Sequence, residues 1–338
     1  MEWTVAIGVD THKDVHVAVA VDRFGAQLDS HEVETTETGY RSLLSWALEL
    51  GLPAFAVEGC GSYGAGLVRF LELTGVAVWE CERPRRRERR RGKSDLIDAA
   101  LAARRLLAGE GLSLPRGGGR REELRMLLLE RRSAVQARTA ALNQLSSLLV
   151  TAPDRVRDRL RALSGERLAA AAARLRPGTD LSCAAMRRLG RRVACLSEEI
   201  VETEQELAGL LAELAADLLE ECGVGPVSAA QLLVSSGNRE RMTSEASFAA
   251  LAGTSPIDAS SGKQRRHRLN RGGDRQLNSA LHVIALARIR HHGETAAYYQ
   301  RLLARGRTAR EARRCVKRAL ARHFYRRLRE ISTIALTT

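Results

Sequence analysis

Two aspartates, Asp95 and Asp98, stand three residues apart within residues 93–99. Apolar residues surround them, which predicts a partly buried helix. At this spacing both carboxylates lie on one helix face, where they repel and are costly to bury without a partner. A divalent cation such as Mg²⁺ would relieve both costs. The structural alternative is a first helical turn in which the aspartates favour the helix dipole and Ser94 is the N-cap.

The preceding residues predict a small α/β domain, residues 1–108. Alternating or continuous apolar segments predict strands, and two segments have helical periodicity. The predicted strands are 4–10, 16–22, 27–33, 54–58 and 76–80, and the predicted helices are 39–50 and 63–73. With the helix that carries Asp95 and Asp98, the order is βββαβαβα. Asp10 ends the first strand and Glu58 ends the fourth.

This order resembles the RNase H-like fold of nucleases and integrases. In that fold, strands one and four are neighbours and their terminal carboxylates meet those of a helix that crosses the sheet. The resemblance implies that Asp10 and Glu58 converge with Asp95 and Asp98. Convergence of four acidic groups is chemically sensible around metal ions, which stabilise the attacking and leaving oxygens of a phosphoryl transfer.

Glycines and histidines lie close to these acidic residues in the sequence. Four glycines within residues 59–66 follow Glu58, and they fit either a close approach to phosphate or a tight strand-to-helix turn. His12 and His16 are interpreted as surface or core histidines rather than as proton carriers.

Length and charge distribution limit the function classes. The chain has 338 residues, enough for two or three domains, and a net charge of +14. Residues 1–80 contain 12 acidic and 4 basic residues, so that part carries −8 and the remainder +22. This asymmetry indicates an acidic catalytic module that basic surfaces bring to a polyanion.

Membrane insertion and disulfide chemistry are not expected. No apolar run reaches the ~18 residues of a membrane span, and the N-terminus does not have the pattern of a signal peptide. The six cysteines are scattered without a CxxC pair. We therefore expect reduced thiols and a cytoplasmic protein without a membrane partner.

A basic run precedes the carboxylate helix. Residues 83–93 contain eight cations and one glutamate. Such a run holds a nucleic-acid backbone over the metal site, or else it is a solvated charge run. The predicted nucleic-acid contacts in this run are Arg85, Arg86, Arg87, Arg89, Arg90, Arg91 and Lys93.

The middle of the chain, residues 119–217, indicates a helical linker. After the glycines at 117–119, residues 120–150 and 181–219 have apolar stripes typical of long helices. We predict an antiparallel hairpin or coiled coil that acts as a spacer or dimerisation arm.

The C-terminal part, residues 218–338, is basic and mostly helical. Gly223 and Gly225 lie in a segment that resembles a helix–hairpin–helix, where a helix N-terminus suits a phosphate. Residues 301–327 carry 11 arginines and lysines with one glutamate, which predicts a basic amphipathic helix.

A serine-containing loop lies between those two features. Ser260 and Ser261 precede a glycine within an arginine-rich segment. One of them is a candidate nucleophile, and the alternative is phosphate binding by hydroxyls and guanidinium groups. The predicted nucleic-acid contacts here are Lys263, Arg265, Arg266, Arg268 and Arg271.

Taken together, these segments resemble the insertion-sequence "one-ten" family of DEDD transposases, to which the pilin-gene invertases are related. The matching motifs are residues 7–10, 57–58, 93–99, 223–226, 260–263 and 270–274. The resemblance implies an N-terminal RNase H-like (resolvase-like) mixed sheet with helices, a helical linker, and a mostly α C-terminal transposase domain.

The same resemblance implies the chemistry. Asp10, Glu58, Asp95 and Asp98 would bind Mg²⁺, and Ser261, with Ser260 as the alternative, would form a covalent phosphoserine link to DNA. A bridge RNA would pair with donor and target DNA, and the protein would act as a dimer or tetramer.

Two other functions are compatible with the residues. A metal-dependent nuclease or Holliday-junction resolvase would use the carboxylates to activate water, with no covalent intermediate. A nucleic-acid-binding protein without catalysis would need only the basic segments.

Overall fold

A computed structural model of the protein describes residues 3–81, 94–115, 118–176, 180–237, 242–258, 267–268, 270 and 272–331. The chain divides into two compact units. The N-terminal unit comprises residues 1–118 and 237–243, and the C-terminal unit comprises residues 119–236 and 244–338. No helix in the described part of the chain combines the length and the apolar character needed to span a membrane.

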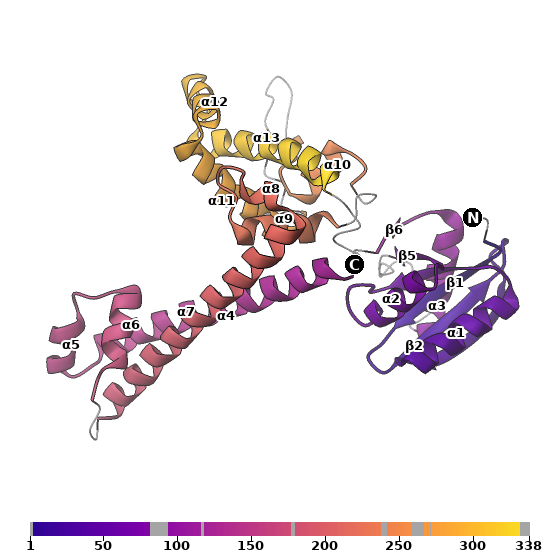
Figure 1. Cartoon of the computed structure of the whole chain (residues 1–338), viewed down its shortest axis with the longest axis horizontal. Helices are drawn as coiled ribbons and strands as arrows, with labels where there is room; N and C mark the ends of the chain where they lie inside the picture. The colour runs from indigo at the N-terminus through magenta and orange to yellow at the C-terminus, as the bar shows by residue number, and fades with distance from the viewer. Residues whose placement is uncertain are drawn as a thin grey trace. The chain divides into compact units, whose positions relative to one another are not determined.

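The N-terminal unit is built on a six-stranded mixed sheet in the order β3-β2-β1-β4-β5-β6 (Figure 1). Its elements are β1 (Val5–Thr11), β2 (Val15–Val21), β3 (Gln27–Glu34), α1 (Glu37–Leu50), β4 (Pro53–Glu58), α2 (Ala65–Leu73), β5 (Ala77–Cys81), α3 (Asp95–Ala108) and β6 (Leu112–Ser113). β1 is antiparallel to β2 and parallel to β4. The predicted α/β order and the adjacency of strands one and four are confirmed, whereas the short β6 was not predicted.

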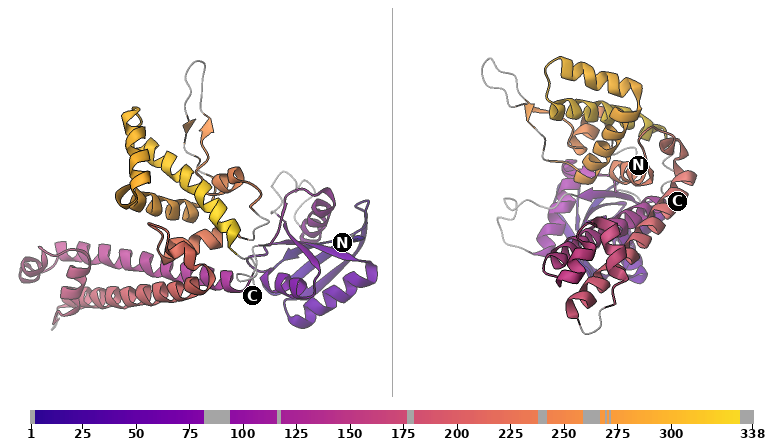
Figure 2. Two further views of the ribbon diagram at one scale, coloured as in Figure 1. Left: turned by 45° about the horizontal axis from the view of Figure 1, so that its top comes forward. Right: turned by 90° about the vertical axis from the view of Figure 1, so that its left-hand side faces the viewer.

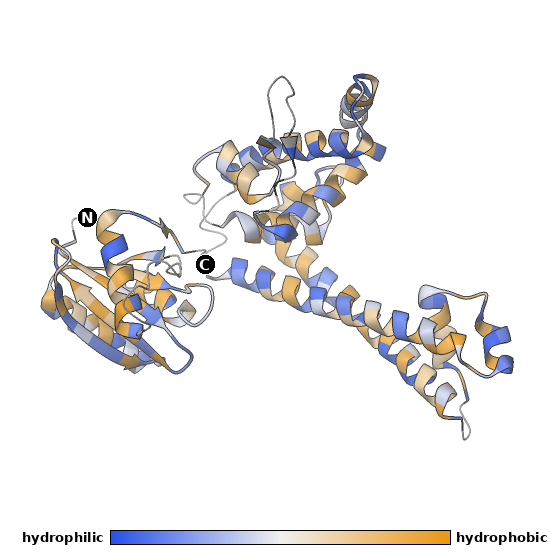
Figure 3. Ribbon diagram, turned by 180° about the vertical axis from the view of Figure 1, so that it is seen from behind, coloured by the Kyte–Doolittle hydropathy of each residue, from blue (hydrophilic) through white to orange (hydrophobic). Residues whose placement is uncertain are grey.

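Both faces of the sheet are covered, which explains why β1 and β4 are buried along their whole length. On one face, Ile7 and Phe55 pack with residues of α1 and α2. On the other face, Ala6 and Ala56 pack with the small side chains of α3. Figure 3 shows the central strands mostly in the hydrophobic colour.

Gly8 brings α3 into backbone contact with β1. A Cβ atom at Gly8 would lie 1.9 Å from the carbonyl oxygen of Ala99 and 2.3 Å from the backbone nitrogen of Ala103. Only glycine permits this approach, because any side chain would overlap the helix backbone. The contact therefore fixes how closely the helix that carries Asp98 lies against the strand that carries Asp10.

The C-terminal unit begins with a helical arm and continues as a helical domain. The arm contains α4 (Arg120–Val150), α5 (Asp154–Leu160), α6 (Gly165–Ala173) and α7 (Leu181–Leu214). The domain contains α8 (Ala216–Leu219), α9 (Pro226–Ser236), α10 (Glu245–Leu251), β7 (Ile257–Asp258), β8 (His267–Arg268), α11 (Arg275–His291), α12 (Gly293–Ala304) and α13 (Ala309–Glu330).

The two long helices of the arm, α4 and α7, run antiparallel and side by side (Figure 2). Arg120 pairs with Glu213 at 3.2 Å, and Arg131 pairs with Glu204 at 2.6 Å. From the first ion pair to the second, the residue number rises on α4 and falls on α7, as an antiparallel pair of helices requires. The predicted helical pair is present, although its second helix ends at Leu214 rather than at residue 219. The coiled-coil geometry and the role in dimerisation stay predictions.

One predicted element of the C-terminal unit is wrong. Residues 301–327 form the end of α12 and most of α13, not one continuous basic helix. Gly306 has a φ of +78°, which ends α12. Thr308 and Glu311 then form a capping box that starts α13.

We predict that Gly8→Ala destabilises the protein strongly. The added methyl group must push α3 away from β1, and overpacking of this kind costs about 3 kcal/mol. Urea unfolding followed by circular dichroism measures the loss.

Gly61→Ala is the matched control, because nothing lies within 4 Å of a Cβ atom at Gly61. Its free energy of unfolding should stay within about 0.5 kcal/mol of the wild type. Equal stability of the two variants would show that α3 does not rest on Gly8.

Candidate active site

Asp10 and Glu58 lie next to each other at the ends of neighbouring parallel strands. β1 and β4 pair Val9 with Val57, so the next residue along each strand is acidic: Asp10 on β1 and Glu58 on β4. Asp10 and Glu58 are each 8% exposed. The Thr11 hydroxyl donates a hydrogen bond of 2.8 Å to the backbone carbonyl of Glu58, which ties the two strand ends together.

Asp95 and Asp98 occupy the first turn of α3. Asp98 is buried at 4% exposure, whereas the side chain of Asp95 is about half exposed. Ser94 stands at the N-cap position, as the structural alternative requires, but its side chain makes no capping hydrogen bond. A capping role therefore does not account for the sequence of this turn.

The acidic residues interact electrostatically. Burial, and next the negative charge of Glu58, raise the pKa of Asp10 from 3.8 to about 6. The charges of Asp95 and Asp98 contribute to this rise of the Asp10 pKa, whereas the charge of His12 opposes it. The structure thus brings all four carboxylates predicted from the sequence close enough together for each of the other three to act on Asp10.

His12 lies between two of these carboxylates. Its Nε2 is 3.5 Å from an Asp10 oxygen and 3.3 Å from an Asp95 oxygen. His12 is exposed, as a surface histidine would be, yet it belongs to the cluster. Sequence reasoning did not assign His12 to the site, although His12 follows Asp10 by two residues, just beyond the end of β1 at Thr11. His16, by contrast, is 0% exposed and stacks on Tyr40, as expected of a core histidine.

The donor atoms fit a divalent cation. Oxygen atoms of Asp10 and Asp95 and a nitrogen of His12 all lie within 4.8 Å of one another. Carboxylate oxygens suit Mg²⁺, and an imidazole nitrogen beside them also suits a transition metal such as Mn²⁺. The raised pKa of Asp10 gives the energetic reason, since a cation would relieve the repulsion that disfavours its ionised form.

The glycines after Glu58 form a tight turn. Gly59 has a φ of +71°, and its carbonyl accepts hydrogen bonds from the backbone nitrogens of Ser62 and Gly64 at 2.9 and 3.2 Å. This geometry favours the turn over the phosphate-binding interpretation.

Most predicted nucleic-acid contacts lie outside the described residues. They are Arg85, Arg86, Arg87, Arg89, Arg90, Arg91, Lys93, Lys263, Arg265, Arg266 and Arg271, and both candidate nucleophiles, Ser260 and Ser261, also lie outside. Arg268 is described and is exposed on β8.

Gly223 and Gly225 lie in the turn between α8 and α9. Gly223 has a φ of +80°, and a Cβ atom there would lie 2.9 Å from the Ala287 side chain on α11. No atom lies within 4 Å of a Cβ atom at Gly225. Gly223 is thus required for packing, while Gly225 leaves room at the start of α9.

A mixed sheet with buried carboxylates at the ends of two adjacent strands and on the helix above them defines a candidate metal-binding α/β domain. The comparisons with known proteins agree with this class. Residues 7–153 match a family model for a transposase, the DEDD type of IS110. Residues 215–300 match a second model, described as "Transposase IS116/IS110/IS902 family".

A curated relative is also similar to part of this chain. The "Insertion element IS110 uncharacterized 43.6 kDa protein" of Streptomyces coelicolor is 32% identical over 139 residues. The aligned segment covers 40% of this chain and 34% of the relative, so the chain spans about a third of the length of that protein. Two separate segments of the chain are therefore similar to transposases of the IS110 type.

We predict that Asp10→Asn stabilises the metal-free protein at pH 7. The pKa of folded Asp10 lies above its ordinary value, so the folded state holds this proton more tightly than the unfolded chain. Stability of the wild type should fall as the pH rises from about 4 to about 6 and then level off. The amide avoids that loss, and we expect a gain of about 2 kcal/mol in the free energy of unfolding. Urea unfolding in a chelating buffer across this pH range measures it.

Asp29→Asn is the contrasting variant. The Asp29 carboxylate accepts a hydrogen bond of 2.8 Å from Trp46, and this bond lowers its pKa. Its ionised form therefore stabilises the fold, and the amide should not. A gain in stability for Asp29→Asn but not for Asp10→Asn would contradict the electrostatic description of the cluster.

Proposed function

We propose that this protein is the DNA transposase of an insertion sequence, and that it cuts and rejoins DNA strands at the carboxylate cluster. The observation that carries the proposal is the convergence of Glu58, Asp95 and Asp98 on Asp10. The two transposase family matches give the reaction class.

The proposed fold of the catalytic domain, residues 1–108, is RNase H-like. The sheet order β3-β2-β1-β4-β5, with β1 and β4 parallel at its centre, supports this assignment. So does the position of the acidic residues at the ends of those two strands and on α3. We further propose that residues 119–217 act as a linker and dimerisation arm, and that residues 218–338 form the transposase domain.

Asp10, Glu58, Asp95 and Asp98 would hold Mg²⁺. A bound Mg²⁺ supplies Lewis acidity toward the phosphate oxygens and the attacking oxygen. Asp10 is mostly ionised at pH 7, because its pKa is about 6, and its burial keeps water from competing for the oxygens. The Thr11 hydrogen bond to the Glu58 carbonyl keeps the two strand ends in register. The exposed imidazole of His12 lies 3.5 Å from an Asp10 oxygen and 3.3 Å from an Asp95 oxygen, where it could also contact the metal.

Strand transfer is proposed to pass through a serine. Ser261, or Ser260 beside it, would attack the phosphorus, so that an oxygen–phosphorus bond to the serine forms. The bond to a deoxyribose oxygen breaks, and that oxygen takes a proton. The serine–glycine step within the arginine-rich segment supports this role.

Target choice is proposed to come from a bridge RNA that pairs with donor and target DNA. The chain is strongly basic and only 4% aromatic, which suits a protein that holds nucleic-acid backbones and leaves sequence reading to base pairing. A dimer or tetramer would bring the DNA ends together.

We predict that Mg²⁺ raises the melting temperature of the wild type but not that of an Asp10→Ala, Asp98→Ala double variant. The bound ion stabilises only a folded state that holds its ligands. Glu49→Gln removes one exposed acidic charge on α1, away from the cluster, and should keep the full response. Differential scanning fluorimetry across a Mg²⁺ titration makes the comparison, and an equal response of the double variant would rule out the metal site.

We predict a covalent protein–DNA adduct when the protein, its RNA and element-end DNA are mixed with Mg²⁺ and then denatured. The adduct should be absent for Ser261→Ala and for Asp10→Ala, and gel mobility of labelled DNA detects it. If Ser260→Ala loses the adduct and Ser261→Ala keeps it, the nucleophile is Ser260.

A metal-dependent nuclease or junction resolvase is the second candidate. It is favoured by the fact that the carboxylate cluster lies entirely within the N-terminal unit. Full strand cleavage by Ser260→Ala and Ser261→Ala, together with none by Asp10→Ala, would establish this alternative.

A further inference from the structure

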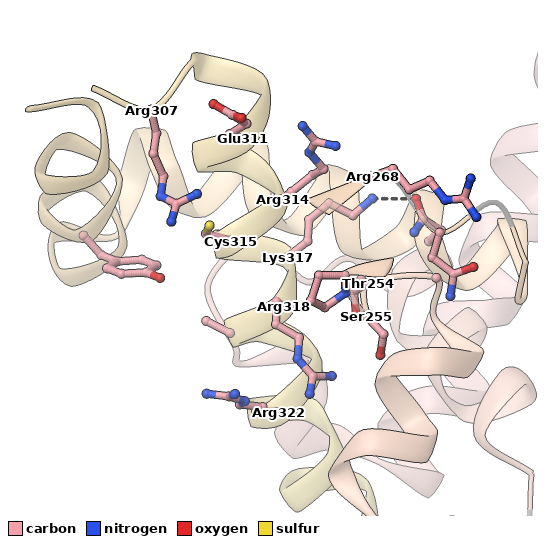
Figure 4. Close-up of a pocket in the computed structure, with 16 residues that line it drawn as sticks. Thr254, Ser255, Arg268, Arg307, Glu311, Arg314, Cys315, Lys317, Arg318 and Arg322 are labelled. Carbon is pink, nitrogen blue, oxygen red and sulfur yellow. Dashed lines mark hydrogen bonds between the residues drawn. The ribbon is translucent and has the colours of Figure 1, made fainter. Parts of the chain in front are cut away.

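The C-terminal unit contains a cavity of about 730 Å³ lined by basic side chains. It lies between the loop after α10, the short strand β8, and helices α11, α12 and α13 (Figure 4). Six cations line it, and Glu311 is the one acidic residue among the lining groups; the cations are Arg268, Arg307, Arg314, Lys317, Arg318 and Arg322.

Backbone contacts between two glycine turns build one wall of this cavity. Gly253 and Gly273 both have positive φ values, +61° and +91°. A Cβ atom at Gly273 would lie 2.4 Å from the Leu251 carbonyl oxygen. The backbone nitrogen of Asp274 donates a hydrogen bond of 2.7 Å to that same oxygen. The turn after α10 is thus held against the turn that starts α11.

Asn278, on α11, connects this wall to α13. Its amide nitrogen donates a hydrogen bond of 2.6 Å to the Ala252 carbonyl, and its amide oxygen accepts one of 2.5 Å from the Lys317 ammonium. Lys317 is therefore held toward the loop that contains Thr254 and Ser255. Figure 4 shows Arg314, Lys317 and Arg318 extending from α13 on this side.

Among the described residues, carboxylates neutralise the cations of this cavity only in part. Within the described ranges, Arg322 reaches Glu245 only at 4.0 Å, and no ion pair is formed by Arg314, Lys317 or Arg318. The Glu311 carboxylate accepts hydrogen bonds of 2.9 Å from the Thr308 backbone nitrogen and hydroxyl. These bonds, and to a smaller extent the charges of Arg314 and Arg307, lower the pKa of Glu311. Among described residues, the buried Nη1 of Arg318 has no hydrogen-bond partner.

Lys317 shows the energetic consequence. Burial lowers the pKa of its ammonium group from 10.5 to about 8. A cation that is partly desolvated without a carboxylate partner is unfavourable in the free protein, and an incoming anion relieves that cost.

We propose that this cavity binds backbone phosphates of a nucleic-acid strand, with Arg314 and Lys317 as contacting cations and Asn278 as the residue that positions Lys317. The proposal does not require the carboxylate cluster to be catalytic. The spacing favours a repeating polyanion over a single small anion. Arg314, Arg318 and Arg322 recur every four residues along α13, so their Cα atoms are about 6 Å apart along the helix axis.

Binding of the full-length protein to fluorescein-labelled single-stranded DNA and to RNA of the same sequence tests the proposal. Anisotropy is measured in a chelating buffer over a series of salt concentrations, so neither metal nor cleavage enters the result. Arg314→Gln and Lys317→Gln should each weaken binding by about tenfold. Each should also make the negative slope of log affinity against log salt concentration shallower by about 0.7. If the substitutions weaken the binding of only DNA or only RNA, that nucleic acid is the one that occupies the cavity.

Arg310→Gln is the matched control, since it removes the same charge from an exposed position of the same helix outside the cavity. It should change affinity by no more than about twofold. An equal loss for Arg310→Gln and Arg314→Gln would overturn the proposal, because the effect would then be one of net charge. Displacement of the oligonucleotide by polyglutamate of matched charge at equal concentration would overturn it in favour of an acidic protein partner.

Lysine labelling tests the site without any substitution. The chain has only four lysines, Lys13, Lys93, Lys263 and Lys317. An amine-reactive reagent near pH 8, followed by peptide mass spectrometry, should modify Lys317 readily, because its lowered pKa leaves much of it neutral. Saturating oligonucleotide should suppress that modification. Unchanged labelling of Lys317 at saturation would refute phosphate binding in the cavity.

Discussion

The contact between Gly8 and the backbone of α3 is the constraint on which the candidate site depends. β1 carries Asp10 and α3 carries Asp98, and these two elements approach closely only because position 8 has no side chain. The alanines that face the sheet from α3 continue the same close packing along the helix. A bulkier interface would place the helix farther from the strand, and the acidic residues of the two elements would no longer share one point.

That closeness has an electrostatic cost that the fold sustains. Asp10, Glu58 and Asp98 are all at most 8% exposed. Burial, together with repulsion from the neighbouring carboxylates, disfavours the ionised form of Asp10. Backbone packing and the Thr11 hydrogen bond hold the groups in place despite this cost. His12 offsets a part of the repulsion. Conflict between local preference and global structure is typical of functional sites, because the fold elsewhere compensates for it.

The sequence predicts the parts of this structure that depend on local patterns. Alternation of apolar residues predicts β1 and β4, and their last residues identify Asp10 and Glu58 as site candidates. It does not predict β6, which has only two residues, or the break at Gly306 within a run of continuous helical composition. Nor does it predict the basic cavity, because its walls come from segments that are distant in the sequence and meet only through tertiary packing. His12 is an intermediate case, because its nearness to Asp10 in the sequence is evident but its approach to Asp95 depends on the packing of α3 against β1.

The proposed function assigns the two charged sites different roles on a nucleic acid, and neither site could fill both. An acidic cluster repels a phosphate until a cation neutralises it, so it cannot supply the attraction that first brings a polyanion to the protein. Residues 1–80 carry −8, and the attraction must come from the remainder of the chain, which carries +22. In the C-terminal unit, the proposed phosphate site would contribute cations that the described carboxylates neutralise only in part. Affinity should therefore depend on salt through the basic groups, and chemistry should depend on divalent cations through the acidic ones, so that either property can be lost while the other is kept.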